Sequence, residues 1–88
     1  VMGNCVQMKE VMDLANENNW IVVEDTCESL MSKCDGKVLG TFGSYGTYSF
    51  YFSHHLCTGE GGMVVCNTKE DYNLARSLRA HGWTRDME

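Results

Sequence analysis

The sequence predicts an α/β fold, and three observations carry this prediction. An amphipathic helical pattern comes first, a short apolar run rich in β-branched residues follows it, and two further strand patterns lead into a second helical pattern. Helices that alternate with strands in this way are typical of α/β domains. With 88 residues the chain could bury only a thin core by itself, so we expect residues 1–88 to be one part of a larger domain.

The first predicted helix begins at Asn4 and ends at residues 18–19. Asn4 and Gln7 have the spacing of an N-cap residue and its N3 partner, which together satisfy free backbone N–H groups at a helix start. Four apolar residues then recur at helical spacing: Met8, Val11, Met12 and Ala15. We expect this apolar stripe to pack against a sheet.

A continuous apolar run over residues 20–23 predicts a parallel strand that is buried on both faces. The run ends on Glu24 and Asp25. The carboxyl ends of parallel strands form the sheet edge at which α/β proteins bind ligands, so Asp25 is placed to contact a cofactor. A solvated strand end or a helix cap explains the same residue equally well, and both interpretations stay open on its position alone.

The middle of the chain predicts a hairpin turn and a long aromatic strand. Residues 34–37 have the composition of a tight hairpin turn, and residues 28–31 suggest one short turn of helix. Alternation over residues 46–52 then predicts a strand, with three aromatic residues on one face: Tyr48, Phe50 and Phe52. Ser49, on the other face, approaches the same edge as Asp25 if the two strands run in the same direction.

A further strand and a second helix complete the pattern. We expect residues 62–66 to pair antiparallel with the preceding strand. Thr68 and Asp71 form a capping box that starts the helix. Three residues share one face of this helix: Leu74, Leu78 and His81. Gly82 is the expected C′ residue, because glycine readily adopts the left-handed backbone that ends many helices.

Composition argues against two classes of partner. The chain has 12 acidic and 7 basic residues and a formal charge of −5, with Lys and Arg scattered, so we expect no binding to nucleic acid. No run approaches the roughly 20 apolar residues that span a bilayer, and no leader pattern is present, so we expect a cytoplasmic protein without membrane contact. Five cysteines without a C-x-x-C pair indicate reduced thiols rather than disulfides.

Two adjacent histidines, His54 and His55, stand in the loop before residues 62–66. With Cys57 they could bind zinc, although adjacent side chains of an extended chain point in opposite directions and no paired-ligand motif accompanies them. A cysteine nucleophile has no local signature in this chain. The glycine-rich residues 59–62 lead into a strand rather than a helix, which argues against a phosphate-binding loop.

Five spaced motifs together resemble one family. They are residues 21–25 (IVVED), 36–43 (GKVLGTFG), 49–54 (SFYFSH), 59–62 (GEGG) and 79–82 (RAHG). Their order and spacing resemble the DegT/StrS sugar aminotransferases, which are pyridoxal phosphate (PLP) enzymes of fold type I. The resemblance implies that residues 1–88 are part of the large cofactor-binding domain, a three-layer α/β/α structure with a mostly parallel sheet.

The resemblance also assigns roles to residues of this chain. It implies that Asp25 pairs with the pyridine nitrogen of the cofactor and keeps it protonated. Ser49 would hydrogen-bond the cofactor phosphate. Glu28 occupies a position that is commonly glutamine in the family and touches the ring hydroxyl side. No metal ligand is implied.

His54 stands where the aminotransferases of the family carry the lysine that binds the cofactor covalently. Imidazole forms no stable Schiff base, but it ionises near neutral pH and can act as a base. Histidine here resembles the sugar 3-dehydratase branch of the family, which uses freely bound pyridoxamine phosphate (PMP). The resemblance then implies removal of the C3 hydroxyl of a 4-keto-6-deoxy hexose, with His54 as the catalytic base beside the cofactor.

The same resemblance implies partners and leaves alternatives. A nucleotide-linked keto sugar would be the substrate, glutamate the amino donor and a homodimer the assembly. Residues 82–87 lack the cysteine cluster of the iron–sulfur dehydratases, which favours the cluster-free kind. The alternatives are a PLP-dependent sugar aminotransferase relative or a non-catalytic sugar-binding homologue, followed by a zinc-binding module. We expect the 88-residue piece alone to be inactive.

Overall fold

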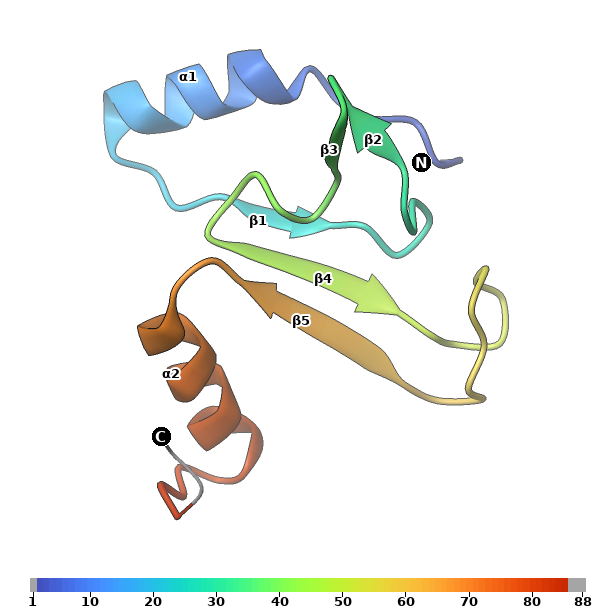
Figure 1. Cartoon of the computed structure of the whole chain (residues 1–88), viewed down its shortest axis with the longest axis vertical. Coiled ribbons are helices and arrows are strands. Elements are labelled where there is room, and N and C mark those ends of the chain that lie inside the picture. Colours follow the sequence, from blue (N-terminus) through green and yellow to red (C-terminus); the bar gives the residue numbers. More distant parts are fainter. Residues whose placement is uncertain (1, 86–88) are drawn as a thin grey trace.

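Two helices and five short strands form within residues 2–85, the part of the chain described by the structure, a computed structural model. In chain order they are α1 (Met8–Asn18), β1 (Val23–Asp25), β2 (Lys33–Cys34), β3 (Lys37–Val38), β4 (Tyr45–Ser49), β5 (Gly62–Cys66) and α2 (Lys69–Arg79). One sheet contains β1, β4 and β5, and a separate hairpin contains β2 and β3 (Figure 1). This order agrees with the predicted α/β class.

The sheet has β4 at its centre. β1 pairs with β4 in parallel, with Asp25 opposite Thr47, and β5 pairs with β4 antiparallel. The antiparallel pair was predicted, and the parallel pair settles the direction of β1 and β4, which the sequence left open. The carboxyl ends of β1 and β4 therefore lie at the same edge of the sheet, and the loop over residues 50–61 extends from that edge (Figure 1).

The connection from α1 to β1 differs from the prediction. α1 ends as expected, with Asn19 in a left-handed conformation (φ 56°). Trp20 still belongs to this helix end, because its N–H donates to the carbonyl oxygen of Ala15 at 2.8 Å. β1 therefore begins only at Val23. Ile21 and Val23 are 75% and 58% exposed, so the prediction of a strand buried on both faces is wrong for the described residues. Within these residues, β1 has β4 as its one neighbouring strand.

The start of α1 was predicted four residues too early. The helix begins at Met8, and the preceding Gln7 makes no side-chain capping hydrogen bond, so Asn4 is not the N-cap. The backbone N–H of Met2 instead donates to Oε2 of Glu28 at 3.1 Å. This contact holds the start of the chain beside the segment after β1, and residues before Met8 connect that point to the helix.

The aromatic strand ends earlier than predicted. The N–H of Phe50 still donates to the carbonyl of Gly61 at 2.9 Å, in register with β5, but the Phe50 carbonyl accepts from the N–H of Thr58 at 2.8 Å, and this bond within the loop ends the pairing. Phe52 is 68% exposed, whereas Tyr48 within β4 is buried. The predicted aromatic face therefore stops at Tyr48, and the next aromatic residues belong to the loop.

The predicted hairpin turn between β2 and β3 is confirmed. Asp35 and Gly36 have φ values of 49° and 81°, and two positive φ angles are the mark of a type I′ turn. The suggested turn of helix over residues 28–31 is replaced by successive tight turns. Met31 has a φ of 61°, a left-handed conformation that cannot continue a right-handed helix.

The predicted capping box of α2 is confirmed. The hydroxyl of Thr68 accepts from the N–H of Asp71 at 3.0 Å and donates to Oδ2 of Asp71 at 2.7 Å. The Tyr45 hydroxyl of β4 donates to Oδ1 of the same carboxylate at 2.6 Å. Hydrogen bonds from Tyr45 and Thr68 lower the pKa of Asp71, and the bond to Asp71, with burial, raises the pKa of Tyr45. Asp71 therefore both starts α2 and fixes it to the sheet.

The end of α2 lies one residue away from the prediction. His81 is outside the helix and takes the left-handed C′ position itself, with a φ of 59°. The N–H of Gly82 then reaches back to the carbonyl of Ser77 at 2.7 Å, as in a Schellman motif. The predicted apolar stripe on α2 is open, since Leu74 and Leu78 are 52% and 68% exposed.

The core of the described part is thin, as the chain length predicts. Its buried apolar residues are Met8, Ala15, Leu39 and Tyr48. All five cysteines are free thiols. No helix within residues 2–85 has the length and apolar character that crossing a membrane requires.

Candidate functional site

Side-chain alternation on β1 and β4 separates a covered face from an open one. Glu24 and Tyr48 are buried, at 8% and 7% exposure, and both contact the segment over residues 39–43. Asp25 is exposed and Ser49 is half-buried. Because neighbouring side chains of a strand point to opposite faces, the buried residues can anchor the strands while their neighbours remain accessible.

The Glu24 carboxylate fixes residues 39–43 to β1. Its Oε1 accepts from the N–H of Gly40 at 2.7 Å, and its Oε2 accepts from Phe42 and Gly43 at 2.7 and 2.8 Å. A buried carboxylate requires such donors, because burial without partners costs several kcal/mol. Sequence reasoning missed this role. The available signal was an acidic residue next to Asp25 on a strand, which alternation directs to the opposite face.

Residues 39–43 lie directly on the sheet. A Cβ atom on Gly46 would stand 1.9 Å from the carbonyl oxygen of Gly40, so only glycine fits there. Gly40 also has a φ of 91°, which favours glycine. The hydroxyl of Tyr48 donates to the carbonyl of Leu39 on the same segment. Backbone contact and hydrogen bonds therefore hold this segment from both strands.

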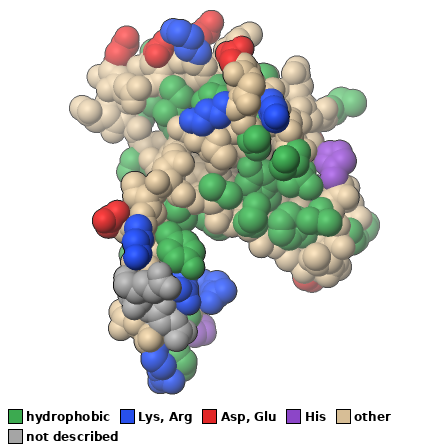
Figure 2. Space-filling view, in the orientation of Figure 1, with side chains coloured by type: hydrophobic (Ala, Val, Ile, Leu, Met, Phe, Trp, Pro, Cys, Tyr) green, Lys and Arg blue, Asp and Glu red, His purple; other side chains and the backbone are tan. Residues whose placement is uncertain are grey.

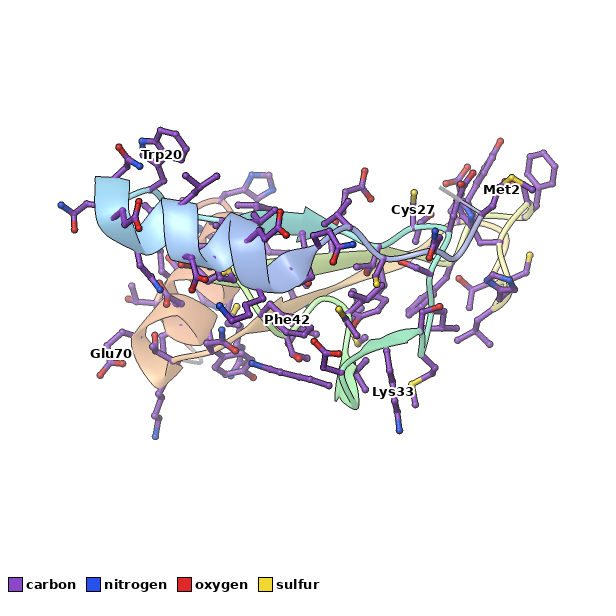
Figure 3. All side chains as sticks on the ribbon, turned by 90° about the horizontal axis from the view of Figure 1, so that it is seen from above. Met2, Trp20, Cys27, Lys33, Phe42 and Glu70 are labelled. Atoms are coloured by element: carbon purple, nitrogen blue, oxygen red, sulfur yellow. The ribbon has the colours of Figure 1, made fainter. Side chains whose placement is uncertain are left out.

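Asp25 is the last residue of β1. Its Oδ1 accepts from the N–H of Cys27 at 3.2 Å. A hydrogen bond to Asp25 raises the pKa of the Cys27 thiol, and burial and the charges of Asp25 and Glu28 act in the same direction. The thiol therefore stays protonated at neutral pH and adds no second anion beside the carboxylate. Figure 3 shows Cys27 near the end of the molecule that lies opposite Trp20.

Ser49 is the last residue of β4. Its hydroxyl oxygen accepts from the N–H of Tyr51 at 3.4 Å. Asp25 is paired with Thr47, so Ser49 lies two residues farther along the neighbouring strand. Strand rise and strand spacing place the Cα atoms of Asp25 and Ser49 about 8 Å apart. Parallel pairing thus brings these two predicted residues to one edge of the sheet.

His54 lies in the loop beyond this edge. It is half-buried, and its backbone N–H donates to the carbonyl of Tyr51 at 3.0 Å, while His55 is exposed. An open cleft of about 550 Å³ is lined by Met2, Glu28, Ser53, His54 and His55. Figure 2 shows histidine (purple) at the surface on the side where this loop lies. The cleft brings Glu28 and His54 together, whereas Asp25 and Ser49 do not line it.

Comparison with known proteins decides the family. The sequence matches the DegT/DnrJ/EryC1/StrS aminotransferase family over residues 1–88. The chain belongs to this family. The match covers both helices, every described strand and all four predicted site residues, and it agrees with the resemblance found in the sequence motifs.

Several relatives of this DegT-family chain share one name. GDP-4-keto-6-deoxy-D-mannose 3-dehydratase of Yersinia pseudotuberculosis is 38% identical over 87 residues, which cover 99% of this chain and 22% of the relative. The Escherichia coli enzyme, solved with bound hydrated PLP, is 39% identical, with a TM-score of 0.91 over 100% of this chain and 23% of that one. A further solved 3-dehydratase, with a trapped PLP–glutamate geminal diamine, is 38% identical, with a TM-score of 0.92 and the same coverage.

These similarities confirm the predicted fold and show how much of the relatives' length the chain covers. The described residues adopt the α/β fold of PLP-dependent members of the DegT family. The chain spans less than a quarter of the length of these relatives.

The side chains at this edge fit a PLP-type cofactor by their chemistry. Asp25 presents an exposed carboxylate, which is the acceptor that a protonated ring nitrogen requires. Ser49 presents a hydroxyl that can donate to a phosphate, and His54 presents an imidazole. Within residues 2–85, no group of three His, Cys, Asp or Glu residues converges to hold a metal ion, so the zinc alternative gains no support.

Proposed function

We propose that the protein containing this chain is a PMP- or PLP-dependent nucleotide-sugar 3-dehydratase, and that residues 1–88 are part of its cofactor-binding domain. His54 is the observation that carries the proposal. The sequence resemblance expects the family's covalent lysine at this position, and His54 lies on the loop that leaves the same sheet edge as Asp25 and Ser49. The 3-dehydratases at 38% and 39% identity support this choice.

The proposed cofactor contacts divide between the two strand ends and the cleft. When bound, the cofactor supplies a ring that accepts electrons from the carbon attached to it. The Asp25 carboxylate would accept a hydrogen bond from the ring nitrogen and hold a proton on it. The Ser49 hydroxyl would donate to the phosphate. Glu28, which lines the cleft with His54, would contact the side of the ring that carries the hydroxyl.

His54 would move the proton in the reaction. Loss of the C3 hydroxyl of the sugar requires a base, and imidazole takes up and returns protons near neutral pH. The open cleft beside Glu28 gives substrate access to this side chain. Because imidazole forms no stable Schiff base, the cofactor would be bound non-covalently. The hydrated PLP of the Escherichia coli relative, whose aldehyde has added water rather than an amine, supports this point.

The remaining partners follow from the relatives. The substrate would be a nucleotide-linked 4-keto-6-deoxy sugar, since GDP-4-keto-6-deoxy-D-mannose is the substrate in the relatives' names. Glutamate would supply the amino group, and the PLP–glutamate geminal diamine of one relative supports this assignment. We expect a cytoplasmic homodimer.

The test is to replace His54 with asparagine in the whole protein. Asn keeps a polar side chain but has no basic nitrogen, so turnover of a 4-keto-6-deoxy nucleotide sugar should fall by about 100-fold or more, while PLP binding, followed by absorbance, is retained. The His81→Asn variant, which makes the same change at the exposed end of α2 and outside the cleft, is the control and should keep wild-type turnover. Unchanged turnover in His54→Asn would refute the proposed base.

A sugar aminotransferase is the second candidate, because the family as a whole is one of aminotransferases. Borohydride reduction followed by mass spectrometry separates the two. A reduced PLP–lysine adduct, with an amino sugar formed from glutamate, would establish the aminotransferase and refute the dehydratase. A 3-deoxy sugar product with no attached cofactor is the result we expect. A protein that binds the nucleotide sugar without any turnover would be the non-catalytic homologue.

A further inference from the structure

We infer that Glu24 and Thr26 are positioning residues that hold Asp25 at the sheet edge for the cofactor ring; this inference rests on the proposed function. β1 has only three residues, and Asp25 is the last of them. Glu24 and Thr26, on either side, are 8% and 4% exposed, whereas Asp25 is exposed. An accessible carboxylate therefore stands between two buried polar side chains.

The first anchor is the Glu24 carboxylate. It accepts three hydrogen bonds of 2.7 to 2.8 Å from backbone N–H groups, all within residues 40–43. These residues are themselves fixed, because Gly40 lies against the backbone of Gly46 in β4. Displacing the backbone of Glu24 would break three bonds to a rigid segment, so the residue before Asp25 has a defined position.

The second anchor is Thr26. Its N–H and its hydroxyl both donate to the carbonyl oxygen of Thr47, at 3.0 and 2.6 Å. The Thr47 hydroxyl in turn donates to the carbonyl of Glu24 at 3.3 Å. Thr47 is the residue paired with Asp25, so the backbone on both sides of Asp25 is joined to one residue of β4.

A purely structural role makes a different prediction from a positioning role. Residues that only stabilise the fold lower the thermal midpoint without a specific effect on PLP affinity. Residues that position Asp25 weaken PLP binding more than their effect on stability explains. Tyr45→Phe is the matched control, because it removes a hydroxyl of β4 that donates to Asp71 of α2, at the end of the strand opposite Ser49.

The experiment compares the whole protein with its Glu24→Gln, Thr26→Val and Tyr45→Phe variants. Each is measured for its thermal midpoint and, well below all midpoints, for the Kd of PLP by absorbance titration. One lost hydrogen bond at the anchor should raise the Kd about tenfold in Glu24→Gln and in Thr26→Val. Tyr45→Phe should lower the midpoint and leave the Kd at the wild-type value. Thr26→Val keeps the side-chain shape, so it carries the test if Glu24→Gln does not fold.

Two results would overturn the inference by itself. Wild-type PLP affinity in Thr26→Val and in every folded Glu24→Gln sample is the first. An equal loss of affinity in Tyr45→Phe is the second, because it would make the effect a general one of stability. Wild-type protein that binds no PLP would refute the proposed function, and this inference with it, so the two failures are distinguishable.

Discussion

Replacing Glu24 with glutamine should release residues 40–43 from β1. The amide oxygen can keep the two bonds from Phe42 and Gly43, now without charge assistance, but the amide nitrogen faces the N–H of Gly40, which is left unpaired. The two weakened bonds and the unpaired buried donor destabilise the closed segment, and the lower cost of burying a neutral group partly offsets this. The net loss of free energy is about 3 kcal/mol. Local opening of the segment should therefore become about 100-fold more frequent.

Amide hydrogen exchange of the whole protein measures this effect directly. The amides of residues 40–43 should be protected in the wild type and should exchange about 100-fold faster in Glu24→Gln, with smaller changes in α2. Glu10→Gln makes the same chemical change on the exposed face of α1 and should leave exchange unaltered. The reasoning fails if the segment exchanges at the rate of a free loop in the wild type, or if Glu24→Gln leaves its protection intact.

Three further outcomes follow from single contacts. Gly46→Ala should destabilise the protein by about 1 to 3 kcal/mol in denaturant unfolding, because its Cβ would stand 1.9 Å from the Gly40 oxygen and the backbone must move. Protection of α2 should decrease as the pH falls below about 4, because the pKa of Asp71 is lower in the folded state than in the unfolded state and protonation of Asp71 removes this stabilisation. In pH-dependent exchange, Asp71→Asn should remove this transition, and Tyr45→Phe should weaken it, since the Thr68 hydroxyl still donates to Asp71. Alkylation of Cys27 by iodoacetamide should accelerate at higher pH than that of glutathione, because its thiol pKa is raised.

Local signals in the sequence predicted the elements whose hydrogen bonds are local. Asp35 and Gly36 are the two residues that connect β2 to β3. Both have positive φ angles, which aspartate and glycine adopt more readily than most residues. Thr68 and Asp71, which are three residues apart in the sequence, cap the start of α2 through a hydrogen bond. The loop after β4 indicated the antiparallel pairing of β5, and the apolar run after a helix indicated a parallel strand, but only the structure shows that β1 runs parallel to β4.

Several of the errors involve partners that are distant in the sequence. Glu24 bonds to groups 16 to 19 residues away, so its role as an anchor cannot be read from its neighbours. Phe50 lies outside β4, against its strand propensity, because its carbonyl accepts from Thr58 in the loop. The capping pattern at Asn4 is overridden by the bond from Met2 to Glu28, which joins residues 26 apart. Tertiary contacts decided each of these positions.

The positions of the lysines strengthen the choice of dehydration over transamination. The chain has four: Lys9, Lys33, Lys37 and Lys69. Two lie on the helices and two on the β2–β3 hairpin, where Lys37 stands over the ring of Phe42 at 4.7 Å. None lines the cleft that contains His54. Within this chain, the place next to the predicted cofactor residues is therefore held by imidazole, and a covalent amine would have to come from another part of the protein. A PLP–lysine adduct would distinguish an aminotransferase, so the proposed 3-dehydratase function depends on His54 standing at the position of the lysine rather than on the overall fold.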